Sequence, residues 1–180
     1  RTFWNKSHIL GTDALGRDLL ARLIFGAQIS LTVAFIAAFV NLIIGMLYGG
    51  VSGYLGGTAD IIMMRIVDII STIPLMLYVI LIMVLLNSGF LSIVIALGLV
   101  YWVDMARIVR GQILSLKNME FVLAAETIGT SAKDILLRHL LPNAMGPIIV
   151  AMMMLIPNAI FIEAFMSFIG LGVAAPYASW

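Results

Sequence analysis

The side chains that could do chemistry are few in this sequence, and they do not form a recognisable catalytic set. There are two histidines, His8 and His139, and no cysteine. The histidines stand too far apart in the sequence to indicate a metal site, so we expect His139 to be an ordinary polar residue. No Ser-His-Asp set, no H-E-x-x-H and no G-x-x-x-x-G-K-[ST] segment is present. We therefore predict that the chain is not an enzyme, binds no cofactor or metal, and leaves any ATP hydrolysis to other proteins.

Four polar residues within apolar stretches are candidates for a transport pathway or gate, because ionisable and amide groups are costly in a bilayer. Asp68 could face a pathway, but we favour a self-neutralising pair with Arg65, three residues earlier. Asn41 and Asn158 could line a pore or form hydrogen bonds between helices, and the second role is more usual. Glu163 lies near the end of its stretch, and it could sit at the outer interface or face the pathway.

The composition points to a membrane protein. Hydrophobic residues make up 63% of the chain and charged residues 11%, and the mean hydropathy is +1.15. A soluble domain is nearer 45–50% apolar, so a soluble fold of this length could not bury so much apolar surface, whereas a bilayer can. The net charge of +1 argues against a nucleic-acid partner. We predict an all-α, polytopic transmembrane protein.

About four membrane spans are expected. Residues 27–50 carry no charge and would form a helix of about 36 Å, enough to cross the hydrocarbon core. The second span, 61–86, should kink or break at Pro74. A third begins at residue 90 and stays apolar to 103, and the last covers 144–168.

Four glycines follow one another at intervals of four residues from the end of the first span. They are Gly45, Gly49, Gly53 and Gly57. Small residues at this spacing let two helices approach closely, so we expect helix packing rather than ligand binding.

Residues 1–26 are more polar than the rest and are expected to form an extracytoplasmic or interfacial segment before the transmembrane domain of 27–180. Asp18 and Arg22 have the spacing of a helical ion pair, and apolar residues recur nearby at helical intervals. This predicts a short surface helix lying along the membrane.

Residues 120–143, EFVLAAETIGTSAKDILLRHLLPN, predict a helix, a tight turn and a second helix. Phe121–Ile128 would be ended by Gly129, and Ser131 would cap the next helix, which Pro142 would close. The surrounding loop, about 104–143, is rich in Lys and Arg and is therefore assigned to the cytoplasmic side. A compact helical loop there suits docking into a groove of a partner.

This segment resembles the signature of the inner-membrane permease subunits of ATP-binding cassette (ABC) importers, which reads Glu-Ala-Ala, three residues, Gly, nine residues, Ile, one residue, Leu-Pro. Two positions depart from it, since Leu123 replaces the Glu and His139 replaces the Ile. The residues that stand at its offsets, and that the resemblance implies for coupling to the ATPase, are Ala124, Ala125, Gly129, His139, Leu141 and Pro142. Bulky replacements at the two alanines are expected to block assembly with the ATPase.

Other segments resemble the C-type permease of the dipeptide/oligopeptide/nickel group. They are HILGTDALGRDLLARLIFGAQISL (8–31), GYLGG followed by Asp60, MRIVDI (64–69), and SFIGLGV with Pro176 and Trp180. The resemblance implies the type I importer fold with six helices per subunit, of which this sequence would hold the second to fifth. It also implies a bacterial or archaeal cytoplasmic (inner) membrane location, a homologous permease partner, two ABC ATPases that hydrolyse ATP, and an extracytoplasmic binding protein. Expected solutes are dipeptides or oligopeptides, and nickel chelates or glutathione are also carried by similar permeases.

Two alternatives are an ion-coupled secondary transporter and a channel subunit. The first would be expected to show paired broken helices in internal repeats, and no convincing repeat is present. Neither alternative needs a helical loop with the offsets described above.

Overall fold

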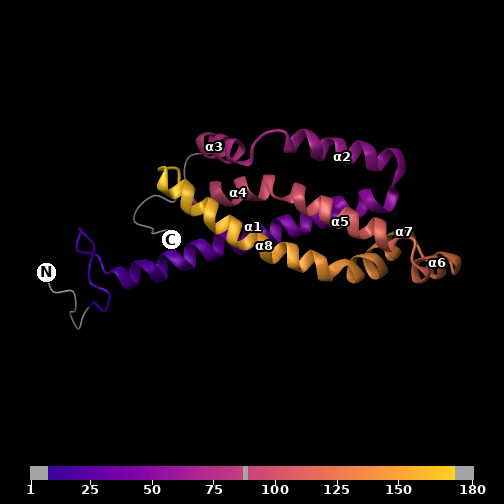
Figure 1. The fold of residues 1–180 in the computed structure, drawn as a ribbon, viewed down its shortest axis with the longest axis horizontal. Helices are drawn as coiled ribbons and strands as arrows, with labels where there is room; N and C mark the ends of the chain where they lie inside the picture. The colour runs from indigo at the N-terminus through magenta and orange to yellow at the C-terminus, as the bar shows by residue number, and fades with distance from the viewer. Residues whose placement is uncertain (1–7, 87–88, 173–180) are drawn as a thin grey trace.

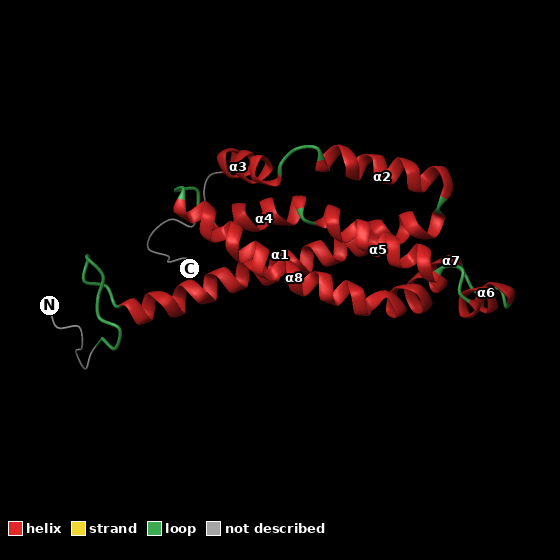
Figure 2. Cartoon of the chain, viewed as in Figure 1, coloured by secondary structure: helices red, strands yellow, loops and turns green. Residues whose placement is uncertain are grey.

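The computed structural model describes residues 8–86 and 89–172. Within these ranges the chain is helical, with no β-strand, and the helices are joined by short loops (Figure 2). Asn87 and Ser88, between the second and third expected spans, and the motif residues Pro176 and Trp180 lie outside the described residues. The elements are α1 (Leu19–Leu55), α2 (Gly57–Ser71), α3 (Leu75–Leu86), α4 (Phe90–Val100), α5 (Trp102–Leu116), α6 (Glu120–Thr127), α7 (Ala132–Asp134), the π-helical turn η1 (Ile135–Leu140) and α8 (Leu141–Phe168).

Three continuous helices among the described residues are long and apolar enough to cross a membrane: Leu19–Leu55, Phe90–Leu116 and Ala132–Phe168. A fourth crossing is possible only if α2 and α3 act together, because they meet at a bend of 76°. This bend confirms the break expected at Pro74, which has no N–H to donate and whose ring obstructs a continuous helix. The prediction of about four spans therefore agrees with the fold.

The helices run back and forth along one direction (Figure 1). The α1 helix runs the length of the molecule, α2 and α3 return along one edge, and α4 and α5 run beside them. The α6–α7 segment projects from one end, and α8 returns across α1 toward the other end. The N-terminal loop and the α6–α7 segment thus lie at opposite ends of the bundle.

The buried apolar residues form two clusters along this direction. The α4-side cluster joins the first half of α1 with α3, α4 and the second half of α8. The α5-side cluster joins α5, α6, η1 and the first half of α8. The members of the first are Val33, Ala34, Ala37, Ala38, Val79, Met83, Ile93, Ala96, Leu97, Leu155, Ala159, Ile162 and Met166. The members of the second are Met105, Val109, Ile113, Val122, Ala125, Ile135, Leu140, Leu141, Ala144 and Ile148.

The packing role expected for the spaced glycines is confirmed at three of the four positions. A Cβ on Gly49 would run into the backbone of Ala106, and one on Gly53 would lie 2.9 Å from the Cβ of Ile113. A Cβ on Gly45 would likewise overlap a side chain of α5. Gly57 is different, because it begins α2 with a φ of 54° and has open space around it. The glycines therefore let α1 and α5 touch backbone to backbone.

The N-terminal region differs from the expected surface helix. Helix α1 already begins at Leu19, where the Asp18 carboxylate accepts a hydrogen bond from the N–H of Leu20. Arg22 pairs with Asp13 at 2.6 Å, and not with Asp18 as predicted. The preceding residues form a compact loop, closed by the bridge between Thr12 and Asp18. The helical spacing of Asp18 and Arg22 was misleading because Asp18 is occupied as the helix cap.

Candidate coupling segment and polar pocket

The helix and turn predicted for residues 120–143, the candidate coupling segment, are present in the structure. Helix α6 covers Glu120–Thr127, and Gly129 follows with a φ of 81°. The Gly129 N–H donates to the Glu126 carbonyl at 2.9 Å, and the Thr130 N–H donates to the Ala125 carbonyl at 3.0 Å. This pair of bonds is a Schellman motif, in which a left-handed residue satisfies the last carbonyls of a helix. The left-handed backbone at this position explains why glycine, which adopts it without strain, ends the helix.

The second helix of the segment begins as expected but does not end where expected. The Ser131 hydroxyl accepts the N–H of Asp134 at 3.2 Å and donates to its carboxylate at 2.7 Å. The helix then continues through η1 and α8 as one element, Ala132–Phe168. The prediction that Pro142 closes this helix is wrong. The wider π turn lies directly before Pro142, where it gives space to a proline ring that would obstruct a regular α-helical turn.

Helix α6 has an inner and an outer face. Val122 and Ala125 are 0% and 5% exposed and belong to the α5-side cluster. Leu123 and Ile128 are 51% and 82% exposed, and Ala124 is also exposed. The two adjacent alanines of the motif therefore differ in environment, because Ala125 is buried and Ala124 is exposed. Ala125 fixes α6 to its own chain, and Ala124 is free to meet another surface.

The remaining motif residues divide in the same way. Leu141 is buried in the α5-side cluster, Pro142 is exposed, and His139 is half-buried. The His139 carbonyl accepts a hydrogen bond from the side chain of Asn143 at 2.6 Å. Some residues of the signature are thus buried and pack the segment against the rest of the chain, and others are exposed to solvent.

The candidate pathway residues fall into different environments. Asn41 is fully buried and donates to the carbonyls of Ala37 (2.6 Å) and Leu97 (3.3 Å), which is the interhelical role favoured from the sequence. Glu163 is also fully buried, and its carboxylate accepts hydrogen bonds from the hydroxyls of Ser30 (2.7 Å) and Ser167 (3.1 Å). It therefore joins α8 to α1. Asn158 is exposed on α8.

Asp68 does not form the predicted pair with Arg65. Its Oδ1 lies 3.3 Å from Nη2 of Arg107 on α5. The same guanidinium lies 3.3 Å from Asp104 Oδ1, and it donates to the Ser71 hydroxyl at 2.7 Å. Sequence spacing could not reveal this group, because it depends on α2 and α5 lying side by side. The available signal was one charged residue inside a predicted span, Asp68, and two directly after the next, Asp104 and Arg107.

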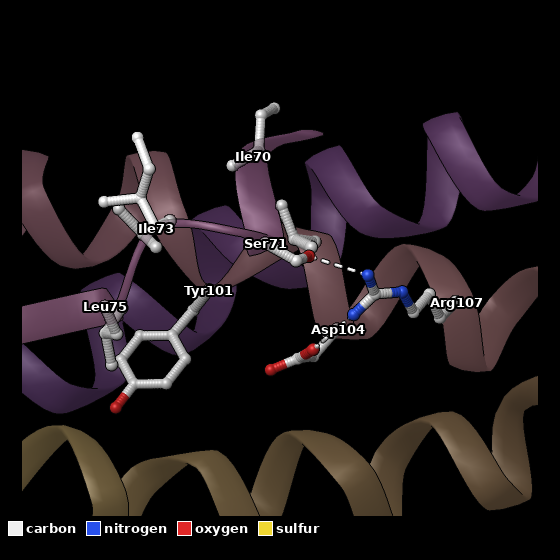
Figure 3. A pocket seen from close by; sticks show the side chains of 9 residues that line it. Ile70, Ser71, Ile73, Leu75, Tyr101, Asp104 and Arg107 are labelled. Carbon is white, nitrogen blue, oxygen red and sulfur yellow. Dashed lines mark hydrogen bonds and ion pairs between the residues drawn. The ribbon is translucent and has the colours of Figure 1, made fainter. Parts of the chain in front are cut away.

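A pocket of about 240 Å³ opens beside this group (Figure 3). It lies where α2 gives way to α3 and where α4 gives way to α5. Its lining combines an apolar wall with Ser71, Asp104 and Arg107, whose side chains meet at one side of the view in Figure 3. The apolar and aromatic lining residues are Ile70, Ile73, Leu75, Val100, Tyr101 and Val103.

Comparison with known proteins shows the family to which this chain belongs. Residues 41–180 match the family described as binding-protein-dependent transport system inner membrane component. The chain belongs to this family. Membership and the apolar helices identify it as a multi-pass protein of the cytoplasmic membrane.

Its relatives include transport permeases of bacteria. The chain is 51% identical over 176 residues to the oligopeptide transport system permease protein OppC of Bacillus subtilis (strain 168), covering 98% of the chain and 58% of the relative. It is 53% identical over 173 residues to the dipeptide permease DppC of the same organism, covering 96% and 54%. OppC of Escherichia coli (strain K12) is 48% identical, with coverage of 96% and 57%. The chain therefore spans somewhat more than half the length of these relatives.

A solved structure supports the fold. The chain is similar to a chain of the MetNI methionine ABC transporter in an inward-facing conformation, with a TM-score of 0.69 and 18% identity. The match covers 86% of this chain and 77% of the other. The type I importer permease fold expected from the sequence is thus confirmed.

Proposed function

We propose that this family member forms the permease core of an ABC importer that moves peptides across the cytoplasmic membrane by alternating access. Its relatives are named as oligopeptide and dipeptide transport permeases. The observation that carries the mechanism is the two-faced helix α6, which is fixed to the bundle on one side and exposed on the other.

The proposed force enters at the exposed face of α6. The inner residues Val122 and Ala125 pack in the same cluster as Ile113 of α5 and Ala144 of α8. Close-packed interiors transmit displacement because they leave no free volume to absorb it. A push on α6 would therefore move α5 and the first half of α8 as one body, which is the two-state element that alternating access needs.

The proposal assigns the energy source to other proteins. The sequence has no phosphate-binding G-x-x-x-x-G-K-[ST] segment, so two ABC ATPase subunits would hydrolyse ATP and seat α6 in a groove. A second, homologous permease would complete the pathway, and an extracytoplasmic binding protein would deliver the solute. The exposed Leu123 and Ile128 suit the apolar floor of such a groove, because an exposed helix face of this kind is a common docking element.

The test is uptake of a labelled peptide into proteoliposomes that contain the full permease pair, the ATPases and the binding protein. We expect uptake to require ATP, supplied on the side of the vesicle membrane that the ATPase subunits face. Uptake that proceeds without ATP and collapses with an imposed ion gradient would instead favour a secondary transporter. Uptake of amino acids or metal chelates but of no peptide would remove the peptide assignment and leave the importer mechanism standing.

A further inference from the structure

The pocket at the junction of α2, α3, α4 and α5 has features of a solute site. We propose that it receives the amino-terminal end of a transported peptide, with the peptide ammonium facing Asp104 and the first side chain lying on the apolar wall. The inference rests on the proposed function, because it names how the permease would hold its cargo in transit.

The depth of the pocket argues that it faces water and not lipid. Asp104 lies inside the candidate span Phe90–Leu116, about 21 Å along it from Phe90 at a rise of about 1.5 Å per residue, so this helix extends past residue 104, where the sequence predicted the cytoplasmic loop to begin. Its side chain is 74% exposed in this chain, and that of Arg107 is 39% exposed. Charged groups at such a depth are found facing a cavity or a partner helix, because contact with lipid is costly. The pocket is therefore best placed on the aqueous route.

The polar group at one side of the pocket consists of the lining residues Ser71, Asp104 and Arg107 together with Asp68, which pairs with Arg107 but does not itself line the pocket. The charge balance of this group favours a cation. One guanidinium, that of Arg107, is shared between the carboxylates of Asp68 and Asp104, each at 3.3 Å, and the Ser71 hydroxyl at 2.7 Å. Its donors are thus largely engaged. Each carboxylate gives only Oδ1 to Arg107, so the free capacity of the group is that of hydrogen-bond acceptors. An ammonium brings three donors and one positive charge, which complements a group with two acids and one base. An anionic lipid headgroup would be repelled by the two carboxylates and is therefore disfavoured.

The size and walls of the pocket fit one end of a peptide. A volume of about 240 Å³ is below the roughly 300–1,000 Å³ of pockets that enclose a whole small ligand. The wall formed by Ile70, Ile73 and Leu75 would accept an apolar side chain of varied shape, and the ring of Tyr101 lies beside it (Figure 3). Aromatic faces attract ammonium groups, so Tyr101 would support the same ligand end.

The position of the pocket also provides a way to release the ligand. Asp104 and Arg107 stand on α5, which belongs to the body that α6 would move, whereas Leu75 begins α3, which packs in the α4-side cluster. Displacement of one cluster against the other would separate the acidic group from the apolar wall. The two halves of the site would then hold the peptide together in one state only.

The absence of cysteine from this sequence permits a direct test. Ile73→Cys would place a thiol in the apolar wall, and Leu99→Cys would place a control thiol on α4 outside the pocket, at a residue that is 54% exposed. The full transporter would be reconstituted with each variant, and the rate of maleimide labelling of this chain would be measured with a tripeptide, with its N-acetylated form and without peptide. Uptake of the free tripeptide would be recorded in the same vesicles.

We expect the free tripeptide, at about four times its Kd, to slow labelling at position 73 by about fivefold, because about one fifth of the sites then remain unoccupied, and to leave position 99 unchanged. The acetylated peptide should not protect, because it has lost its charge. Protection should vanish with Asp104→Asn and persist with Asp104→Glu, which keeps the carboxylate.

Equal protection by both peptides, or protection that survives Asp104→Asn, would overturn the proposal. So would labelling that follows the anionic lipid content of the vesicles and ignores peptide. Peptide uptake without protection would leave the proposed function intact, whereas loss of all ATP-dependent peptide uptake would remove the function itself.

Discussion

Arg110 of α5 donates two parallel hydrogen bonds, from Nε and Nη2, to the two carboxylate oxygens of Asp60 near the start of α2. The Ser52 hydroxyl, in the last turn of α1, donates to the same carboxylate. The Asp60 side chain is only 8% exposed. One acid therefore fastens three helices together at the end of the bundle from which α6 projects.

Breaking this junction on one side should destabilise the chain markedly. Arg110→Met leaves the Asp60 charge buried without its main partner, and loss of one member of a buried pair costs about 3–5 kcal/mol. Because the Arg110 side chain is 33% exposed and partly screened by solvent, we expect a smaller loss, about 2–3 kcal/mol. The measurement is thermal unfolding of the purified complex. As a control, Asp68→Asn removes an exposed ion pair and should change the stability by less than about 1 kcal/mol. Equal losses for both variants would contradict the assignment.

The turn at Gly129 should couple ATP hydrolysis to transport. Gly129→Val forces a β-branched residue to a φ of 81°, at a cost of about 1–2 kcal/mol or more, so the turn should rearrange and misplace α6. We expect ATP hydrolysis to continue while peptide uptake falls. Gly129→Asn is the matched control, because asparagine adopts left-handed backbone more easily and should retain most of the uptake. Normal uptake by the valine variant in reconstituted vesicles would refute the prediction.

The two alanines of the motif should give different defects when each is replaced by tryptophan. Ala124→Trp adds bulk to the exposed face of α6, so the chain should remain folded but lose co-purification with the ATPase subunits. Ala125 is 5% exposed inside its own chain, so Ala125→Trp should lower the folding stability, because overpacking typically costs about 1–3 kcal/mol. The stability of the isolated permease pair and recovery of the full complex separate the two effects. An unchanged complex with Ala124→Trp would show that this face does not meet the ATPase.

The close contact between α1 and α5 should fail when Gly49 gains a side chain. A Cβ there would overlap the backbone of Ala106, which no rotamer change can relieve, so Gly49→Ala should separate the helices and destabilise the fold. Gly57→Ala tests the backbone alone, because its surroundings are open but its φ is 54°. We expect a smaller loss of thermal stability from Gly57→Ala than from Gly49→Ala, and the reverse order would show that α1 and α5 can move apart freely.

The loop before α1 should resist mild acid. The backbone N–H of Arg17, aided by the side chains of Arg17 and Arg22, holds the pKa of Asp13 well below its usual range. A carboxylate whose pKa is lower in the folded state stabilises that state fully above its unfolded-state pKa; the stabilisation declines below that value and is gone below the folded pKa. Residues 8–18 should therefore keep their full protection against hydrogen exchange down to about pH 3.9, the ordinary aspartate pKa, and lose it progressively in stronger acid. Asp13→Asn should lower this protection at neutral pH, where the carboxylate is ionised, and equal protection in the variant at that pH would contradict the role of the carboxylate.

Much of this protein could be predicted from the order of its residues. Apolar stretches long enough to cross a bilayer, the break at Pro74 and the left-handed turn at Gly129 were all expected, because each depends on local chemistry: hydropathy, a missing N–H, or a φ that other residues avoid. The signature spacing from Ala124 to Pro142 likewise indicates the family, because it depends only on the order of the residues.

Partners distant in the chain were decided only by the tertiary structure. Asp68 pairs with Arg107 and not with nearby Arg65, and Asp60 with Arg110, because α2 lies along α5. Ala124 and Ala125 look equivalent in the sequence, yet the packing of α6 buries one and exposes the other. Local sequence fixes where a helix can form and turn. Which of its faces is covered, and which charge meets which, depends on the helices that fold against it.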